Sequence, residues 1–329
     1  MYIIIGDPHI TKRNLKESKK FFKELFNKID SMNGVEPVDV IFLGDGQHTH
    51  ATISMEVLNL WDKIFKALSK APNTRSVIYL VGNHDISGEV SREREESSFS
   101  VFKDKYSKVM IIDKPIIFGN VAYVPYTSSE ELFVKDCQYL YDNGAENTVI
   151  CHQTFNGAKF ETGMYAPEGF DHSRVPQKNI ISGHIHKRQE FENVIYPGTW
   201  RWMTKSDAND DKGIFFAEEL DIEKIELEFS STENVCTPIK EYIHNEGEKM
   251  PDLNPDHKNY MTLVGTAKWA NTTKKKIKDN AIIKIHTTDN KARRVEVSEN
   301  VTIVEFIEKH MDLEKEVTKK EVIQYIGAL

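Results

Sequence analysis

The chain has 329 residues, of which 39% are hydrophobic, 10% aromatic and 29% charged, with a formal net charge of -8. This composition is ordinary for a globular protein and argues against a disordered chain. No stretch approaches the ~18 uncharged apolar residues of a membrane-spanning helix, and the first residues lack the basic start and cleavage site of a signal peptide. The three cysteines, Cys137, Cys151 and Cys236, are widely spaced without a CxxC pair. We therefore expect buried thiols in a reducing cytoplasm, and neither a disulfide scaffold nor a zinc finger.

The first part of the chain alternates strand-like and helix-like segments. The strand candidates are short apolar runs at residues 2–5, 38–43, 76–81, 109–112, 121–124, 148–151, 179–182, 194–196 and 213–217. Two helix candidates, residues 21–32 and 55–68, carry apolar side chains at i, i+3 and i+4 spacing. Such alternation predicts an α/β layered fold, and the continuous apolar runs are typical of strands covered on both faces.

From about residue 230 the pattern changes. A charged, weakly patterned stretch containing Pro238, Pro251 and Pro255 indicates a boundary region. Strand-like runs follow at residues 260–266, 281–286 and 295–297, and the last thirty residues are typical of two short capped helices. We therefore expect three parts, residues 1–229, 230–298 and 299–329.

Charge is distributed unevenly along the chain. Residues 1–229 carry the whole net charge of -8, whereas residues 258–294 hold 10 basic and 2 acidic residues. This basic block has two readings, a solvated loop and hairpin with lysines outside, or a footprint for a phosphate backbone. As a nucleic-acid contact it would include Lys274, Lys275, Lys276, Lys278, Lys291, Arg293 and Arg294.

Five strand candidates end in residues of metal-binding type. They are Gly6-Asp7-Pro8-His9, Gly44-Asp45, Gly82-Asn83-His84-Asp85, Cys151-His152 and Gly183-His184-Ile185-His186. The glycine before the first polar residue in four of them permits a sharp turn and close backbone approach. Because sites in open α/β sheets form beyond the carboxyl ends of strands, these side chains are expected in one cleft.

Each of these strand ends alone would be read as an ordinary turn or loop, but their combination indicates a metal site. Carboxylates and imidazoles gathered in one cleft would leave buried charge unless cations neutralise it. A mixed set of nitrogen and oxygen donors without thiolate suits Mn²⁺, Fe²⁺ or Zn²⁺ better than Ca²⁺ or Mg²⁺. Two such ions about 3.5–4 Å apart activate water for attack on phosphorus, so the sequence predicts phosphoester hydrolysis.

At these residues the sequence resembles the calcineurin-like metallophosphoesterases, whose pattern is D-x-H, G-D, G-N-H-D/E, a lone His and G-H-x-H. The resemblance implies a two-sheet layered α/β sandwich flanked by helices, followed by a smaller α+β capping domain and a C-terminal helix-loop-helix. It also implies seven ligands for two divalent ions. Asp7, His9 and His186 would hold one ion, Asn83, His152 and His184 the other, and Asp45 would bridge them.

Two further roles follow from the same resemblance. His84 would not be a ligand but would lie over the scissile phosphate, stabilise its charge and help to protonate the leaving oxygen. Asp85 would orient that imidazole, as a carboxylate does for a catalytic histidine.

Within this superfamily the chain looks most like the SbcD and meiotic recombination 11 nucleases. His48 after Asp45, the turn from Tyr196 to Thr199 and the strand entry at Lys212 are similar to theirs. The resemblance implies a DNA exonuclease, with endonuclease cleavage left open, that uses Mn²⁺, and His48 would position the phosphate. It implies a homodimer and an SMC-like P-loop ATPase partner of the SbcC type, bound through the C-terminal helices. The process would be DNA recombination, repair or replication in a bacterium or phage-infected cell.

The chain departs from the family pattern in two places, where Pro8 replaces the usual residue and Gly46-Gln47 precede His48. His50 is read as an exposed loop residue. Self-association would use helices over residues 54–70 and 91–106, whose apolar stripes could instead belong to the core of the same chain. The terminal helices are similarly open to packing on the chain itself.

Two other functions are compatible with the same pattern. The chain could be a protein phosphatase or a small-molecule phosphodiesterase on the same metal core, but the segment after Asp45 lacks the arginine of such phosphatases. A metal-binding scaffold without activity is the third reading, and the complete set of ligand residues together with His84 disfavours it.

Overall fold

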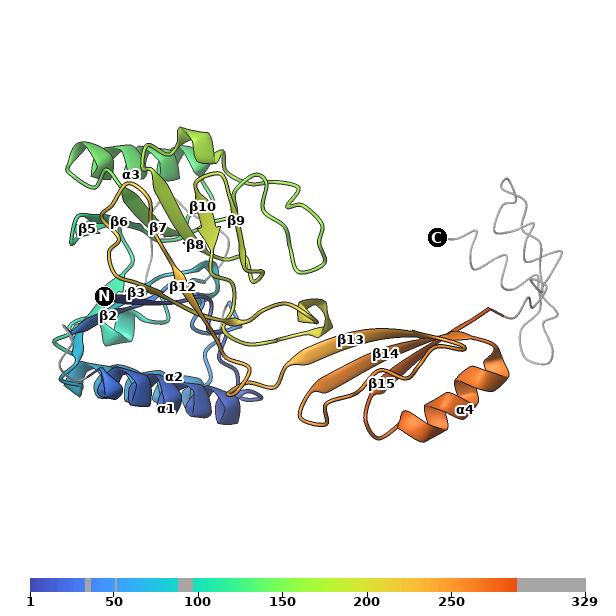
Figure 1. The fold of residues 1–329 in the computed structure, drawn as a ribbon. Helices are drawn as coiled ribbons and strands as arrows, with labels where there is room; N and C mark the ends of the chain where they lie inside the picture. The colour runs from blue at the N-terminus through green and yellow to red at the C-terminus, as the bar shows by residue number, and fades with distance from the viewer. Residues whose placement is uncertain (33–36, 51, 88–96, 289–329) are drawn as a thin grey trace, which may run out of the picture.

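The computed structural model describes residues 1–32, 37–50, 52–87 and 97–288. Two six-stranded sheets face each other and carry helices on their outer sides (Figure 1). We call this body of strands β1 to β12 and helices α1 to α3 the sandwich. It is the α/β layered fold that the sequence pattern predicts, in the two-sheet form that the family resemblance implies, and both expectations are confirmed.

The first sheet has a parallel centre and an antiparallel edge, because β11 runs against β1 and β12 against β11. Its strands β1 to β4 pair in parallel through successive crossovers. In spatial order the strands are β12 (Glu228–Ser231), β11 (Gly213–Ala217), β1 (Tyr2–Ile5), β2 (Val38–Phe42), β3 (Thr74–Leu80) and β4 (Val109–Ile112).

The second sheet is also mixed. Strands β6, β7, β8 and β10 pair in parallel, while β5 and β9 run antiparallel at its two edges. In spatial order the strands are β5 (Ile116–Phe118), β6 (Val121–Val124), β7 (Thr148–His152), β8 (Asn179–Gly183), β10 (Val194–Tyr196) and β9 (Gln189–Phe191).

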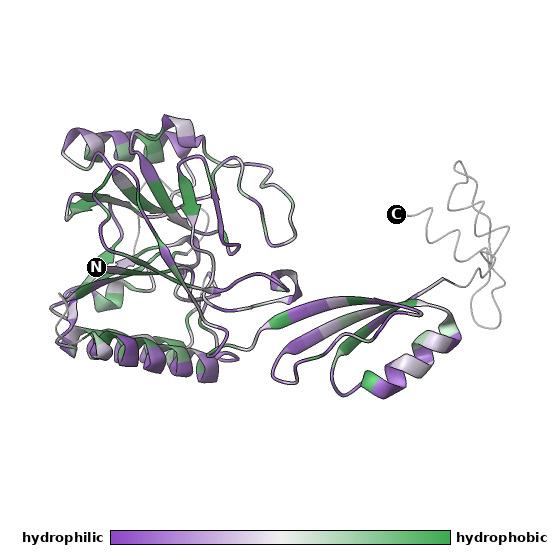
Figure 2. Ribbon diagram, viewed as in Figure 1, coloured by the Kyte–Doolittle hydropathy of each residue, from purple (hydrophilic) through white to green (hydrophobic). Residues whose placement is uncertain are grey.

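Three layers of apolar side chains hold the sandwich together. Helices α1 (Leu15–Ser31) and α2 (Met55–Lys70) pack on the first sheet, and α3 (Glu130–Asp142) packs on the second. Successive strand residues serve different layers: Ile3 and Ile5 face α1 and α2, whereas Ile4 faces the second sheet. Figure 2 accordingly shows the strands mainly hydrophobic and the outer face of α1 mainly hydrophilic.

A small unit lies beside the sandwich and consists of residues 239–287 (Figure 1). It has three parallel strands, β13 (Ile239–Asn245), β14 (Lys258–Gly265) and β15 (Ile282–Thr287), with α4 (Ala267–Ile277) between the last two. Met261 and Leu263 of β14 pack against Ala270 and Ile277 of α4. None of the helices described here is long and apolar enough to cross a membrane.

The structure corrects several details of the sequence reading. The stretch taken as a boundary contains β13, and the expected boundary after residue 229 falls inside β12. The basic block is not a loop and hairpin, because β14 and β15 are parallel and parallel strands need a crossover, here helix α4. Strands β5, β9 and β12 and helix α3 are further elements that the sequence reading did not single out.

The helix expected over residues 91–106 is wrong for the described part of that segment. Residues 97–106 contain only a 3₁₀ turn, Ser100–Phe102, and both Phe99 and Phe102 are buried in the chain's own core. The stripe of α2 enters the same core through Val57, Leu60, Trp61 and Ile64. These apolar side chains therefore stabilise the single chain, and self-association would need another surface.

Several sequence predictions lie outside the described residues. They are the strand-like run at 295–297, the terminal helices and the contacts of Lys291, Arg293 and Arg294. The three cysteines lie in the described part, where each is buried and none forms a disulfide.

Candidate metal centre

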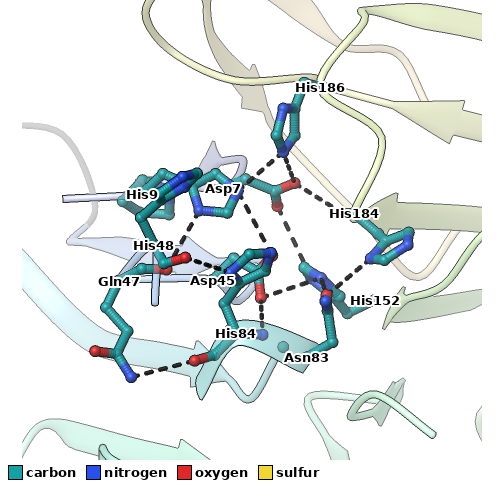
Figure 3. Close-up of polar contacts among 12 residues, drawn as sticks. Asp7, His9, Asp45, Gln47, His48, Asn83, His84, His152, His184 and His186 are labelled. Atoms are coloured by element: carbon teal, nitrogen blue, oxygen red, sulfur yellow. Dashed lines mark hydrogen bonds and ion pairs between the residues drawn. The ribbon is translucent and has the colours of Figure 1, made fainter. Parts of the chain in front are cut away.

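The polar strand ends meet at one place, where the two sheets come together (Figure 3). The parallel strands β1, β2 and β3 of the first sheet lead into the loops that carry Asp7, His9, Asp45, Asn83 and His84. Strands β7 and β8 of the second sheet end at His152 and lead to His184 and His186. Parallel strands place their carboxyl ends on one edge, and the facing of the two sheets brings both edges together.

The backbone is strained at three of these side chains. His9, Asp45 and His184 have positive φ angles of 41°, 54° and 80°, a region that residues other than glycine rarely adopt. Gly44 precedes Asp45 with a φ of 103°, and a Cβ there would lie 2.7 Å from Nδ1 of His152. The tight turn after β2 thus requires glycine, and such strain is typical of functional sites.

Asp7, His9 and His186 form the first donor cluster, which we call site A. Nε2 of His9 lies 2.9 Å from Nε2 of His186, and Nε2 of His186 lies 3.9 Å from Oδ2 of Asp7. Asp7 is 1% exposed and His9 is fully buried. Oδ1 of Asp7 accepts no hydrogen bond from any described residue, which leaves a buried anionic oxygen available to a cation.

Asn83, His152 and His184 form the second cluster, which we call site B. Oδ1 of Asn83 lies 3.0 Å from Nε2 of His152 and 2.8 Å from Nδ1 of His184. The ring of Tyr126 stacks on that of His184, with ring centroids 5.9 Å apart. Site B therefore joins an amide oxygen from the first sheet with two imidazoles from the second.

Asp45 lies between the two sites. Its Oδ1 is 3.4 Å from Nε2 of His152 in site B, and its Oδ2 is 3.6 Å from Nε2 of His9 in site A. The backbone N–H of His84 donates to Oδ1 at 2.9 Å and fixes the carboxylate. One oxygen of Asp45 thus faces each site, the arrangement that a bridging ligand needs.

The hydrogen bonds of the ligand imidazoles leave lone pairs that can bind metal ions. His9 donates Nδ1–H to the carbonyl of Gln47 at 3.2 Å, and His152 donates Nδ1–H to the carbonyl of Leu43 at 2.6 Å. A carbonyl can only accept, so in the neutral rings the lone pairs lie on Nε2, which faces other acceptors. Converging lone pairs repel unless a proton or a metal ion lies among them, so these residues suit a pair of divalent ions.

The pKa values of the clustered groups also favour the binding of a cation. Burial raises the pKa of Asp7 to about 6. Burial alone would lower the pKa of His152, but the carboxylates of Asp45 and Asp7 raise it to about 9. The His152 imidazole therefore binds a proton that a metal ion would replace.

Other groups in the site shift according to their neighbours. Burial alone would raise the pKa of Asp45, but His152 and His9 hold it below its ordinary value. Burial and the nearby His152 lower the pKa of His184 to about 3, so this imidazole stays neutral. Burial opposes protonation of His186, but its hydrogen bond to Glu161 raises the pKa above the ordinary value.

His84 lies beside the two clusters, with Nε2 3.9 Å from Oδ2 of Asp45. Its Nδ1–H donates to the backbone carbonyl of His48 at 2.6 Å. The expectation that Asp85 orients this ring is wrong, because Asp85 accepts hydrogen bonds from Asp45 N, Gly46 N, Gly82 N and the Tyr79 hydroxyl. Asp85 instead fixes the two loops that carry Asp45 and Asn83.

His48 is exposed and adjoins the cluster, with its ring centroid 5.1 Å from that of His9 and 5.6 Å from that of His84. His50 is exposed, as the sequence predicts, but its ring also stacks on His84 at 3.9 Å. Two exposed imidazoles thus flank His84 on the solvent side of the site, a contact that the sequence reading missed for His50.

Two further contacts around the ligands were not predicted. Oε1 of Glu161 lies 3.1 Å from Nδ1 of His186, and the amide of Gln47 donates to the carbonyl of His84 at 3.1 Å. Glu161 could not be singled out from the sequence, because it comes from the loop between β7 and β8, away from every motif. The only sequence signal for Gln47 was its position two residues after Asp45.

The expected DNA contacts lie elsewhere. Lys274, Lys275 and Lys276 form the last turn of α4 and Lys278 follows as its C-cap, and all four are exposed. They belong to the small unit and make no part of the metal centre.

The fold and the paired clusters define a metal-dependent phosphoester hydrolase. The family model of the calcineurin-like phosphoesterases matches residues 2–188. That range is more than half of the chain and includes all seven predicted ligands, so the chain belongs to the calcineurin-like phosphoesterase family. A search of curated proteins found no match.

Proposed function

We propose that this protein is a metal-dependent DNA nuclease that hydrolyses phosphodiester bonds with two divalent ions, Mn²⁺ being the favoured metal. The observation that carries the hydrolytic part is Asp45, whose two oxygens face site A and site B separately. When bound, the two ions would activate water and neutralise charge on the phosphate.

The chain's own residues supply the remaining chemistry. His84 donates Nδ1–H to a carbonyl, so its Nε2 faces the site and can hold the proton that passes to the leaving oxygen. Burial lowers the pKa of His84, against the opposing effect of Asp45. His48, exposed beside it, would contact a phosphate oxygen, and its ring lies near that of His84.

DNA as the substrate is supported by the small unit. A small phosphoester would have little use for the row of exposed lysines on α4, whereas a duplex backbone attracts them. The resemblance to the SbcD and meiotic recombination 11 nucleases favours the same substrate. It also favours a homodimer, and an SMC-like ATPase bound through the terminal helices, which lie outside the described residues.

The alternative is a metallophosphatase or small-molecule phosphodiesterase on the same metal core. One assay separates the proposals: end-labelled duplex and single-stranded DNA, a phosphopeptide and an aryl phosphodiester are incubated with Mn²⁺ or Mg²⁺. We expect Mn²⁺-dependent degradation of DNA, and the label position gives polarity and reveals endonuclease cuts. Hydrolysis of the phosphopeptide with intact DNA would contradict the nuclease, and inertness toward all substrates would contradict hydrolysis.

The location and partners follow as proposals of the same kind. Three buried cysteines that form no disulfide support a reducing compartment such as the cytoplasm of a bacterium or phage-infected cell. Light scattering of the purified chain tests the homodimer. Addition of an SMC-like ATPase to the nuclease assay tests the partnership through a change in cleavage rate.

A further inference from the structure

The loop between β7 and β8 contains an ordered hairpin. The backbone N–H of Ala166 donates to the carbonyl of Ala158 at 2.8 Å, and both alanines are buried. Lys159 next to this pair is anchored to β9, because its N–H donates to Gln189 Oε1 at 2.8 Å and its carbonyl accepts from Gln189 Nε2 at 2.7 Å. The base of the hairpin is thus fixed at two points.

The tip of this hairpin is a tight turn that carries Glu161. The N–H of Phe160 donates to the carbonyl of Met164, and that of Gly163 donates to the carbonyl of Phe160, both at 2.9 Å. Gly163 has a φ of 82° that suits glycine. The turn holds Glu161 over the metal centre, where its side chain is 18% exposed and Oε1 lies 3.1 Å from Nδ1 of His186.

The contact with Glu161 distinguishes His186 from His9 and His152, the other two ligands whose tautomer is fixed by a hydrogen bond at Nδ1. His9 and His152 donate Nδ1–H to backbone carbonyls, whereas His186 donates to a carboxylate. A carboxylate partner fixes the ring and makes the opposite nitrogen a stronger ligand. That nitrogen, Nε2 of His186, faces His9 and Asp7 in site A (Figure 3).

We propose that Glu161 is a positioning residue that strengthens site A selectively and leaves site B unchanged. Site B has no carboxylate as close to an Nδ1 atom among the described residues. Nδ1 of His152 donates to the carbonyl of Leu43, with Oδ1 of Asp7 farther away at 3.8 Å, and Nδ1 of His184 faces Oδ1 of Asn83. The inference rests on the metal centre of the proposed function. It adds that only site A gains metal affinity from a carboxylate outside the ligand set.

The test is a titration of the metal-stripped full chain with Mn²⁺. Calorimetry and electron paramagnetic resonance of the free ion monitor the binding. The unchanged protein should bind two ions, and a His184→Asn variant identifies the step that belongs to site B. In Glu161→Ala the site A step should weaken roughly 10- to 100-fold, with the site B step unmoved. Glu161→Gln keeps an accepting oxygen and loses the charge, so it should weaken site A less.

The matched control is Glu168→Gln, which removes the same charge from an exposed position in the same loop. It should bind both ions like the unchanged protein, and thermal unfolding verifies that each variant is folded. Equal weakening of both steps, or no weakening in Glu161→Ala, would overturn the selective role while the metal centre stands. Failure of the unchanged protein to bind two ions would overturn both proposals.

Discussion

The two parts of the molecule use charge in opposite ways. At the strand ends of the sandwich, Asp7 and Asp45 are each 1% exposed and face buried imidazoles. In the small unit, the lysines at the end of α4 are exposed. Buried charges interact strongly in a low-dielectric surrounding, whereas exposed ones are weakened by water and salt. We therefore expect tight metal binding in the sandwich, and weak, salt-sensitive contacts in the small unit.

The largest effect is expected from Asp45→Asn, which tests the buried charges of the metal centre. The change removes the charge that faces both sites and that supports protonated His152. Hydrolysis should fall by more than the roughly 100-fold that loss of an outer-sphere partner costs, and Mn²⁺ binding should weaken at both sites. Calorimetry and an aryl phosphodiester assay measure the two losses. Retention of both activities would mean that Asp45 does not bridge.

His84→Ser separates chemistry from metal binding within the same buried region. His84 lies against Asp45 and His9 but is not one of the seven predicted ligands, so Mn²⁺ binding should be preserved. Turnover should fall about 10²- to 10⁴-fold, the usual contribution of a general acid. The measurement is kcat with the aryl phosphodiester beside a Mn²⁺ titration. A parallel loss of metal and turnover would show that His84 is a ligand.

The exposed side of the comparison is tested by replacing Lys274, Lys275 and Lys276 together with alanine. DNA affinity should fall, and the slope of log K against log salt should flatten by about 0.9 for each phosphate that the protein no longer neutralises. Hydrolysis of the aryl phosphodiester should be unchanged, because these lysines lie outside the metal centre. The matched control replaces Lys63, Lys66 and Lys70, three exposed lysines of α2. Equal effects of both triple variants would mean that the α4 lysines are an ordinary solvated face with no specific role in DNA binding.

The smallest effect is expected at an exposed ion pair of the sandwich. It tests whether the strength of an ion pair depends on its exposure to solvent or on the part of the molecule in which it lies. Hydrogen bonds from Lys105 and Tyr106 lower the pKa of Asp62. This stabilisation is present above the unfolded-state pKa of about 3.9 and disappears as the pH falls through the lower folded-state pKa. Asp62→Asn should therefore cost only about 0.5 kcal/mol at pH 7.

Urea unfolding of both proteins between pH 7 and pH 3.5 measures that difference. It should stay constant down to about pH 5 and begin to shrink only near the carboxyl pKa. A cost of several kcal/mol at neutral pH would mean that exposure does not weaken this pair.

Much of the sandwich could be predicted because its strands are continuous apolar runs, and β1, β4, β6, β10 and β11 have the predicted bounds. The edge strands β5 and β9 were missed because each has only three residues, too few for a clear pattern. Strand β13 was missed because charged and polar residues interrupt its apolar ones. The expected helix over residues 91–106 failed in its described part, since Phe99 and Phe102 reach the core from a 3₁₀ turn and adjoining loop.

The residue types at the strand ends could be predicted from the sequence, since Asp7, Asp45, Asn83, His152 and their partners follow apolar runs and glycines in a recognisable order. The contacts of each side chain depend on the folded arrangement: Asp85 fixes the loops rather than His84, and Glu161 reaches His186 from a hairpin. The reason is physical. A strand end is a local feature written into neighbouring residues, whereas a contact between distant loops depends on how the two sheets pack together.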